Sequence, residues 1–559
     1  MTDPVPAKGA GRVWFVASVM SALVGLGLAA DSALRTSATY DEVTYLKVAA
    51  AWWRTGSDDA ITRMGSPTLF FKIQQAPVLW MLDRAGFGWV IDDPETHQEA
   101  LLPLVRLASL PVWLIALAVT AAWAKAAYGP RAMALAAALF AISPNLLAHG
   151  SLATMETPMV ACSAAMFALF WRFLRFGERA SFAASAAVGG LAFSCKYTAA
   201  LIPPIFAVLW WMQRRKPGEG PARRAVAVAR GMIAFLLILI ATNLVLTRFD
   251  TTPMSPNNGG HRSVDSRFGG AVGRFFGAAL ETPVPRELVG FVVQTRLQGQ
   301  GGSSYLLGQR RERGWWSYYF VTLGVKVPST FFLLMAGRAW LAWRRRRDEH
   351  DGMMPLAIAL FLAITTAASS RNYGIRYLLP IAPVAIVWVS ALAEARWPWR
   401  VLSIIGLVGP AVAVASVHPH ELCTFAPWVG GPAGGRKILA DSNLDWGQGL
   451  KDLARLQRAR PEFLDITLYY FGETDPGHYN VRGTMHLVDA TGYRTHLPAH
   501  LEASTRYVAV SSSLQFGPWG PQGYFRELDD RDPVILLPGA TIAIYRTDGL
   551  PGKRDPQSQ

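Results

Sequence analysis

The sequence predicts a polytopic α-helical membrane protein with about eleven transmembrane helices, followed by a small extracytoplasmic α/β domain. Three observations support this fold class. Hydrophobic residues make up 51% of the chain, only 17% of residues are charged, and the mean hydropathy is +0.22, which is too apolar for an ordinary soluble protein. Apolar runs of spanning length recur along most of the chain. No such run follows Gly430-Gly431-Pro432.

Most of the apolar runs are long enough to cross a bilayer without interruption. The region 181–213 differs because Lys196 and Pro203-Pro204 interrupt it, so we interpret it as two short helices with Lys196 near the turn between them. The first run, 13–30, could instead be a cleaved signal peptide, but its length and the many runs after it favour a retained helix. The uninterrupted runs lie near 13–30, 103–124, 132–148, 157–174, 226–247, 317–341, 353–369, 377–394 and 401–417.

Positive charge predicts the orientation of these helices. The formal net charge is +15, which in a soluble protein would suggest nucleic acid, but here the basic residues form short runs between apolar segments. The runs at 172–179, 214–224 and 344–347 fall on the side of the N-terminus when eleven spans are counted. By the positive-inside rule that side is cytoplasmic. A single helix at 181–213 would invert every later loop and turn the run at 344–347 outward. We therefore predict a cytoplasmic N-terminus, a bilayer partner and no nucleic-acid partner.

The domain organisation follows from this topology. Residues 1–425 form the transmembrane domain, with large outer loops at 31–102 and 248–316. Residues 430–548 form the extracytoplasmic α/β domain, and the polar residues 549–559 are predicted to be disordered. Within the α/β domain, a helix is expected at Gly449–Arg458 and strands at Lys437–Ala440, Ile466–Phe471, Tyr507–Ser511 and Thr541–Tyr545.

The strongest candidate for chemistry is the adjacent pair Asp41-Glu42, which follows the first span by about ten residues and stands beside Tyr45. A carboxylate at this place could take a proton from an attacking hydroxyl group. Its pKa would be raised by a neighbouring acid and lowered by a nearby cation. The alternative is the ordinary start of an interfacial helix, with Asp41 as N-cap or first-turn acid.

Other polar residues are expected on the same outer side. The segment His149–Pro158 carries Glu156, which could be a second acid or could cap the next helix. Lys196, at membrane depth, could meet a lipid phosphate or could extend its side chain to the headgroups. Arg371 and Arg376 flank a glycine where two helices meet, and arginine suits phosphate contacts; lipid headgroups or loop acids are the alternative partners.

The segment Asp441–Gln448 joins a predicted strand to a helix. Asp441, Asp445 and Trp446 could form a sugar- or acceptor-binding edge with a stacking face, or the polar residues could simply cap the helix. The ten histidines show no HxH or HExxH spacing. The three cysteines are far apart and show no metal-binding spacing. No cofactor is therefore predicted, and a divalent metal has only weak support.

Together these segments resemble a known family. The acidic pair, the HGSLATME loop, the KYTA break, the GIRYLLP turn and the DSNLDWGQ segment occur in this order. They are similar to membrane glycosyltransferases of the protein O-mannosyltransferase and aminoarabinose-transferase superfamily, which has the GT-C fold. More narrowly, the chain resembles bacterial family-39-type enzymes that use a phospholipid-linked sugar. The resemblance runs from about Val13 to Gln448.

The resemblance implies an inverting glycosyltransferase of the bacterial inner membrane. The donor would be a polyprenyl-phosphate-linked, mannose-like sugar, and the acceptor a protein, lipid or glycan on the extracytoplasmic face. Asp41 would be the general base with Glu42 as its partner, and Glu156 stands where relatives often have an aspartate. The residues expected to hold the donor phosphate are Arg376, Arg371 and Lys196, and those expected at the acceptor or sugar are Tyr45, His149, Asp441, Asp445 and Trp446.

One departure from the family pattern concerns the first outer loop. Relatives often carry an acidic residue with a histidine or lysine before a Pro-Pro pair, whereas the matching stretch here is Gln74-Gln75-Ala76-Pro77. The missing charges weaken the expectation of a metal and place more of the donor binding on the arginines.

Three alternatives stay open at this point. The first is an oligosaccharide ligase or polymerase that uses a diphosphate-linked glycan. The second is a non-enzymatic transporter of lipid-linked glycans, which membrane-embedded polar residues would suit, although no inverted repeat is evident. The third is an assembly factor whose outer domain binds a partner.

Overall fold

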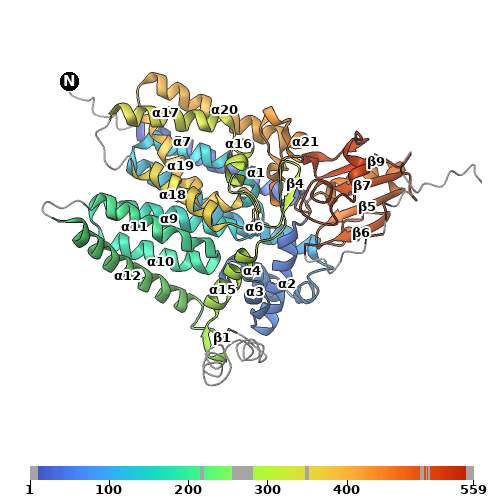
Figure 1. Cartoon of the computed structure of the whole chain (residues 1–559), viewed down its shortest axis with the longest axis horizontal. Coiled ribbons are helices and arrows are strands. Elements are labelled where there is room, and N and C mark those ends of the chain that lie inside the picture. Colours follow the sequence, from blue (N-terminus) through green and yellow to red (C-terminus); the bar gives the residue numbers. More distant parts are fainter. Residues whose placement is uncertain are drawn as a thin grey trace, which may run out of the picture.

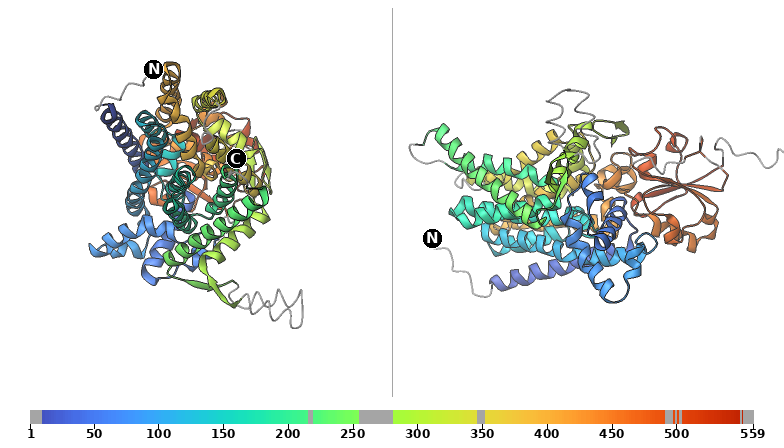
Figure 2. Two further views of the ribbon diagram at one scale, coloured as in Figure 1. Left: turned by 90° about the vertical axis from the view of Figure 1, so that its left-hand side faces the viewer. Right: turned by 90° about the horizontal axis from the view of Figure 1, so that it is seen from below.

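The computed structural model of the chain places a helical bundle at one end of the molecule and a mixed β-sheet at the other (Figure 1). Seen from below, the helices of the bundle run side by side along the long axis and point toward the sheet (Figure 2). The structure describes residues 10–214, 219–254, 281–345, 352–490, 497–498, 500–501, 504–548 and 550.

Five helices of the described chain are long and apolar enough to span a membrane. Two further candidates are bent pairs: α7 (Pro130–Ala141) with α8 (Pro144–Gly150), at 62°, and α16 (Tyr318–Lys326) with α17 (Ser329–Arg345), at 106°. The protein is thus a polytopic helical membrane protein, and the count of eleven crossings stays a prediction. The five long helices are α1 (Ala10–Arg35), α6 (Gln98–Ala127), α9 (Glu156–Phe176), α12 (Pro221–Leu246) and α20 (Trp397–Val417).

The interrupted region 181–213 folds as two helices, as predicted. Helix α10 (Arg179–Cys195) ends before Lys196, whose backbone is extended. A 3₁₀ turn (Tyr197–Leu201) and α11 (Ile202–Gln213) follow. Two shorter apolar segments complete the bundle: α18 (Met353–Ala368) and α19 (Ala382–Ser390) with its 3₁₀ flanks. Of the basic run at 344–347, the last two residues lie outside the described residues.

The first outer loop is largely helical. It contains α2 (Tyr40–Thr55), α3 (Asp59–Arg63), α4 (Leu69–Arg84) and α5 (Gly88–Asp92). Helix α2 buries Val43, Leu46 and Ala49. In the second outer loop, residues 255–280 lie outside the described residues. The rest forms α15 (Arg286–Gln300) and four short strands, β1 (Thr251–Pro253), β2 (Pro283–Pro285), β3 (Ser304–Leu306) and β4 (Gln309–Arg311).

The C-terminal sheet has the strand order β6-β5-β7-β9-β8. Strands β6, β5 and β7 are parallel, whereas β9 pairs antiparallel with both β7 and β8. Helix α22 (Leu450–Ala459) precedes β5, close to the predicted helix. The strands are β5 (Ile466–Phe471), β6 (Thr484–Val488), β7 (Tyr507–Ser511), β8 (Ile535–Leu536) and β9 (Ile542–Arg546).

The predicted strand at Lys437–Ala440 is wrong. This segment continues the turns after α21 (Gly431–Gly435), because the N–H groups of Lys437 and Ile438 donate back to the carbonyls of Gly434 and Gly435. Strands β6 and β8 were not foreseen. The predicted disordered tail, 549–559, lies outside the described residues except for Leu550.

The sheet contacts the start of α2 through stacked aromatic rings. Phe471, at the end of β5, stacks on Tyr40 with ring centroids 5.3 Å apart and on Trp519 at 5.5 Å. Trp519 in turn lies 6.0 Å from Tyr373 in the loop after α18. The backbone N–H of Tyr40 also donates to the carbonyl of Trp446 at 2.8 Å. The first turn of α2 is therefore fixed against both the sheet and the segment 441–448.

Candidate active site

The two acids of the Asp41-Glu42 pair face different surroundings. Both lie in the first turn of α2, and successive residues of an α-helix point about 100° apart. Asp41 faces a cavity of about 220 Å³, whereas Glu42 does not line it. Of the two acids, only Asp41 is therefore placed to contact a molecule in the cavity.

Six segments of the chain meet at this cavity. They are α2, the loop between α3 and α4, the start of α9, the break at Lys196, α15, and the loop after α18. Six residues predicted from the sequence line it: Asp41, Tyr45, Glu156, Lys196, Arg371 and Arg376. Its other lining residues are Tyr40, Thr44, Met64, Gly65, Ser66, Pro67, Met155, Tyr197, Thr198, Gln294, Leu297, Gln298, Tyr373 and Tyr377.

Ion pairs connect the charged groups of the cavity. Nη1 of Arg376 lies 2.9 Å from Oδ2 of Asp41 and 3.8 Å from Oε1 of Glu156. Nζ of Lys196 lies 2.8 Å from the same Oε1 of Glu156. Glu156 and Lys196 are almost completely buried. A charge in such a place is strongly destabilised unless it is paired, so these pairings also hold the cavity together.

Cations outnumber carboxylates among the lining residues. Arg371, Arg376 and Lys196 face Asp41 and Glu156. Nε of Arg371 donates to the carbonyl of Gly301 at 2.6 Å, which fixes the side chain without neutralising it. The cavity consequently has an excess of positive charge, as the binding of a phosphate group requires.

The environment of Asp41 suits a group that exchanges a proton near neutral pH. Burial raises the pKa of Asp41 to about 6, although the positive charge and the hydrogen bond of Arg376 act in the opposite direction. A general base works best when its pKa lies near the working pH. Asp41 is thus ionised at neutral pH and basic enough to accept a proton.

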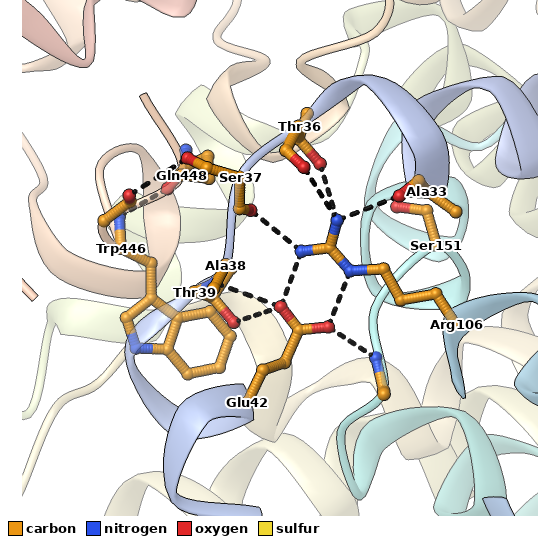
Figure 3. A network of polar contacts seen from close by, with 12 residues as sticks. Ala33, Thr36, Ser37, Ala38, Thr39, Glu42, Arg106, Ser151, Trp446 and Gln448 are labelled. Atoms are coloured by element: carbon orange, nitrogen blue, oxygen red, sulfur yellow. Dashed lines mark hydrogen bonds and ion pairs between the residues drawn. The ribbon is translucent and has the colours of Figure 1, made fainter. Parts of the chain in front are cut away.

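Glu42 has a different role from the one expected (Figure 3). Its carboxylate accepts hydrogen bonds from Nε and Nη2 of Arg106, at 2.8 and 2.6 Å, from the N–H and hydroxyl of Thr39, and from the N–H of Ala153. Its side chain is inaccessible to solvent. A carboxylate with all its acceptor sites used and no access to the cavity cannot touch a substrate there. Glu42 is therefore better described as a positioning residue.

Arg106, which sequence reasoning missed, is the centre of this network. It lies in α6 and is completely buried. Besides Glu42, it donates to the carbonyls of Ala33, Thr36 and Ser37, at 2.9 to 3.0 Å. It thereby connects the end of α1, the turn before α2, and α6. The available indication was an arginine inside the apolar run 103–124, which is costly at membrane depth unless it is paired.

Trp446 does not offer a stacking face, contrary to expectation. It is 2% exposed, and the guanidinium carbon of Arg376 lies 4.6 Å from its ring centroid. His149 approaches the same ring edge-to-face at 6.4 Å and is buried as well. The ring of Trp446 therefore helps to hold the guanidinium of Arg376 in place through a cation–π contact.

The remaining predicted residues also lie outside the cavity lining. Asp441 accepts a hydrogen bond from Nε1 of Trp519 at 3.2 Å. Asp445 accepts from the N–H groups of Gly447 and Ser513 at 3.1 and 3.0 Å. Asp445 thus closes its own turn and does not cap α22, whose N-cap residue is Gly449. Sequence reasoning did not select Gln294 and Gln298, which lie four residues apart on one face of α15 and line the cavity.

Among the described residues, no group of three or more His, Cys, Asp and Glu side chains is arranged to hold a metal ion. Gln74 and Gln75, which replace the charged residues of the family pattern, are both buried in α4. The amide of Gln74 donates to the carbonyl of Thr154 at 3.0 Å, two residues before Glu156.

Part of the chain matches a known protein family. Residues 102–246, which are 145 of the 559 residues, match the sequence pattern of the family described as dolichyl-phosphate-mannose-protein mannosyltransferase. This segment runs from α6 to the end of α12 and contains Arg106, Glu156 and Lys196. Over this segment, the match confirms the resemblance to glycosyltransferases that the sequence motifs indicated, and with it the prediction of a glycosyltransferase enzyme. A comparison with curated proteins finds no match.

Solved structures similar to this chain include two of ArnT from Cupriavidus metallidurans. The form bound to undecaprenyl phosphate is 15% identical, with 97% of this chain and 99% of that chain covered and a TM-score of 0.48. The apo form is 16% identical, with 96% and 98% covered and a TM-score of 0.46. Oligosaccharyltransferase AglB from Archaeoglobus fulgidus, in complex with an inhibitory peptide and a dolichol-phosphate, is 12% identical, with 91% and 70% covered and a TM-score of 0.42. These scores are too low to carry a functional argument.

Proposed function

We propose that the protein transfers a mannose-like sugar from a polyprenyl-phosphate-linked donor to a hydroxyl group of a protein, lipid or glycan acceptor. The observation that carries this proposal is the convergence of Asp41 and Glu156 with Arg376, Lys196 and Arg371 around one cavity. A sugar phosphate needs cations at its phosphate, and an acceptor hydroxyl needs a base. This cavity supplies both within hydrogen-bond reach of each other.

The reaction proposed is a single displacement. Asp41 takes the proton of the acceptor hydroxyl as its oxygen attacks the anomeric carbon. The new carbon–oxygen bond forms as the bond between that carbon and the phosphate oxygen breaks, with inversion. The departing phosphate keeps the electron pair, and Arg376 stabilises the growing negative charge. Lys196 and Arg371 hold the other phosphate oxygens.

An apolar cavity next to the site could receive the prenyl chain of the donor. The 3₁₀ turn Ile375–Tyr377 separates the two spaces: Arg376 and Tyr377 line the charged cavity, whereas Ile375 lines an apolar cavity of about 170 Å³. Leu146, Phe331, Ile358, Leu378 and Ile386 are among its other lining residues. A phosphate at Arg376 would then have its hydrocarbon tail beside apolar side chains, which favour its burial.

We further propose that transfer takes place on the extracytoplasmic face of the bacterial inner membrane. Arg172, Arg175 and Arg179 of the first basic run and Arg214 of the second lie at the ends of α9 and α11 that are opposite the cavity. With those runs in the cytoplasm, as the positive-inside rule requires, the cavity and the C-terminal sheet lie outside and the N-terminus lies inside.

Analysis of the consumed donor tests the proposal. The full-length protein in proteoliposomes would be supplied with undecaprenyl-phosphate-linked mannose or, separately, a diphosphate-linked glycan, each with an extract of cell-envelope acceptors. The lipids on each side of the bilayer would be followed by mass spectrometry. Release of undecaprenyl monophosphate together with a mannose mass increment on the acceptor is expected. Consumption of a diphosphate-linked donor instead would favour the oligosaccharide ligase alternative. Movement of intact donor across the bilayer without transfer would favour the transporter.

A further inference from the structure

A second cavity lies at the end of the helical bundle that is remote from the active site. It is a groove of about 700 Å³ between α9, α10, α11 and α12. Its lining residues are Phe173, Leu174, Gly177, Arg179, Phe182, Trp210, Gln213, Arg214, Ala234 and Ile238. None of them lines the active-site cavity.

Helix α9 fixes the distance between the two sites. Glu156 is its first residue and lines the active-site cavity, whereas Phe173 and Leu174 in its last turn line the groove. An α-helix rises 1.5 Å per residue, so the two sites are about 25 Å apart along the helix axis. This distance approaches the thickness of the hydrocarbon core, so the groove opens near the opposite membrane surface.

The deeper wall of the groove is aromatic and apolar. Phe173, Phe182 and Trp210 pack against one another with ring centroids 4.8 to 5.6 Å apart. Gly231 allows this arrangement, because a Cβ atom there would lie 2.1 Å from Cη2 of Trp210. Ile238, one to two turns further along α12, extends the apolar wall toward the middle of the membrane.

The outer rim of the groove is basic. Arg179 at the start of α10 is exposed, and Arg214 follows the end of α11. Nη2 of Arg214 lies 3.2 Å from Oε1 of Glu219. Its Nε is buried and has no hydrogen-bond partner in the part of the chain that the structure describes. Arg179 and Arg214 are the charged residues among those that line the groove, so positive charge remains after Glu219 pairs with Arg214.

We propose that this groove binds an anionic phospholipid. Basic pockets between transmembrane helices are suited to anionic headgroups, and each nearby arginine contributes attraction at the membrane surface. The headgroup phosphate would contact Arg179 and Arg214, and an acyl chain would lie along Phe182, Trp210 and Ile238. The basic rim of the groove matches the negatively charged headgroup of an anionic phospholipid, and the apolar interior matches its acyl chains. This proposal does not depend on the chemistry of the active site.

Native mass spectrometry of the full-length protein tests it. The protein, released from detergent, would be offered phosphatidylglycerol, phosphatidylcholine with the same acyl chains, or inorganic phosphate. We expect retention of phosphatidylglycerol in preference to phosphatidylcholine. Arg179→Gln and Arg214→Gln should each reduce that preference by about fivefold, which corresponds to the attraction expected of one arginine.

Matched variants distinguish lipid binding in the groove from attraction of the lipid by surface charge in general. Arg223→Gln removes an exposed arginine at the same end of the bundle, outside the groove, and should leave the preference unchanged. Ile238→Trp fills the apolar part without changing charge and should reduce retention of phosphatidylglycerol. The proposal would be overturned by equal retention of both lipids, by equal loss in Arg223→Gln, or by binding of inorganic phosphate as strong as that of the lipid.

Discussion

Nη1 of Arg376 lies 2.9 Å from Oδ2 of Asp41, although 335 positions separate the two residues in the sequence. The same guanidinium lies 3.8 Å from the carboxylate of Glu156 and rests on the ring of Trp446. Four segments far apart in the sequence therefore meet at one arginine. A proton acceptor and a phosphate-binding group are in contact before any substrate enters, which is the arrangement that the proposed transfer needs.

The pH dependence of transfer should report Asp41. Burial raises its pKa to about 6, and the base must be ionised to accept a proton. We therefore expect kcat/KM to be constant above about pH 7 and to fall about tenfold per pH unit well below pH 6. Initial rates measured from pH 4.5 to 8 with the lipid-linked donor check this. A rate that rises toward acid pH would assign the proton transfer to another group.

Substitution of Arg376 by lysine should impair catalysis more than folding. Lysine keeps the charge but lacks the planar fork of donors that reaches Asp41 and a phosphate together. We expect kcat to fall by about 10²–10³, the effect of removing one donor that stabilises a developing anion. Steady-state kinetics with matched circular dichroism spectra measure it. Arg54→Lys, in an exposed ion pair with Asp83, is the control and should keep full activity.

The effects of substituting Lys196 and Glu156 on stability should be strongly non-additive, because the two side chains form a buried ion pair. Lys196→Met leaves the Glu156 carboxylate without its nearest partner, and breaking a buried pair on one side costs about 3–5 kcal/mol. The double variant Lys196→Met/Glu156→Gln removes both charges and should recover most of the lost stability while transfer stays low. Thermal unfolding in detergent and transfer rates of Lys196→Met, Glu156→Gln and the double variant test this. Equal unfolding temperatures for the single and double variants would contradict the coupling.

The network around Arg106 should determine whether Asp41 is correctly placed. Arg106→Leu leaves the Glu42 carboxylate buried without its cation, so we expect a marked fall in the unfolding temperature. Arg106→Leu/Glu42→Gln should restore much of the stability, because no unpaired charge remains. If Glu42 positions the first turn of α2, the double variant should also regain measurable transfer. Complete inactivity of a stable double variant would instead indicate that Glu42 takes part in catalysis directly.

Hydrophobic periodicity and charge made most of the fold predictable from the sequence. Each predicted spanning run corresponds to a helix or bent helix pair, and the break at Lys196 was visible because a lysine and two prolines interrupt an apolar run. The strand at Lys437–Ala440 was wrong because a short apolar run does not distinguish a strand from a turn. Bends between helices, such as the 106° angle after Lys326, depend on packing with distant segments.

The sequence predicted which residues line the cavity better than it predicted what each of them does. Asp41, Glu156, Lys196, Arg371 and Arg376 were recognisable as charges at the outer ends of apolar segments, and all line one cavity. Asp41 faces the cavity and Glu42 does not, because successive residues of a helix point in different directions. The sequence alone does not show which of the two faces the cavity. The burial of Trp446 under Arg376 depends on a contact between segments about 70 residues apart, which local sequence patterns do not encode.

Replacement of Asp41 by asparagine tests the central claim most directly. The variant keeps the shape of the side chain and removes its capacity to accept a proton. Membranes containing the wild-type chain or Asp41→Asn would be compared by mass spectrometry for glycan on the acceptor and for free polyprenyl monophosphate, with the exposed Asp92→Asn as control. We expect transfer by Asp41→Asn to fall by about 10²–10⁴, with Asp92→Asn unaffected. Undiminished transfer by a folded Asp41→Asn protein would contradict the account.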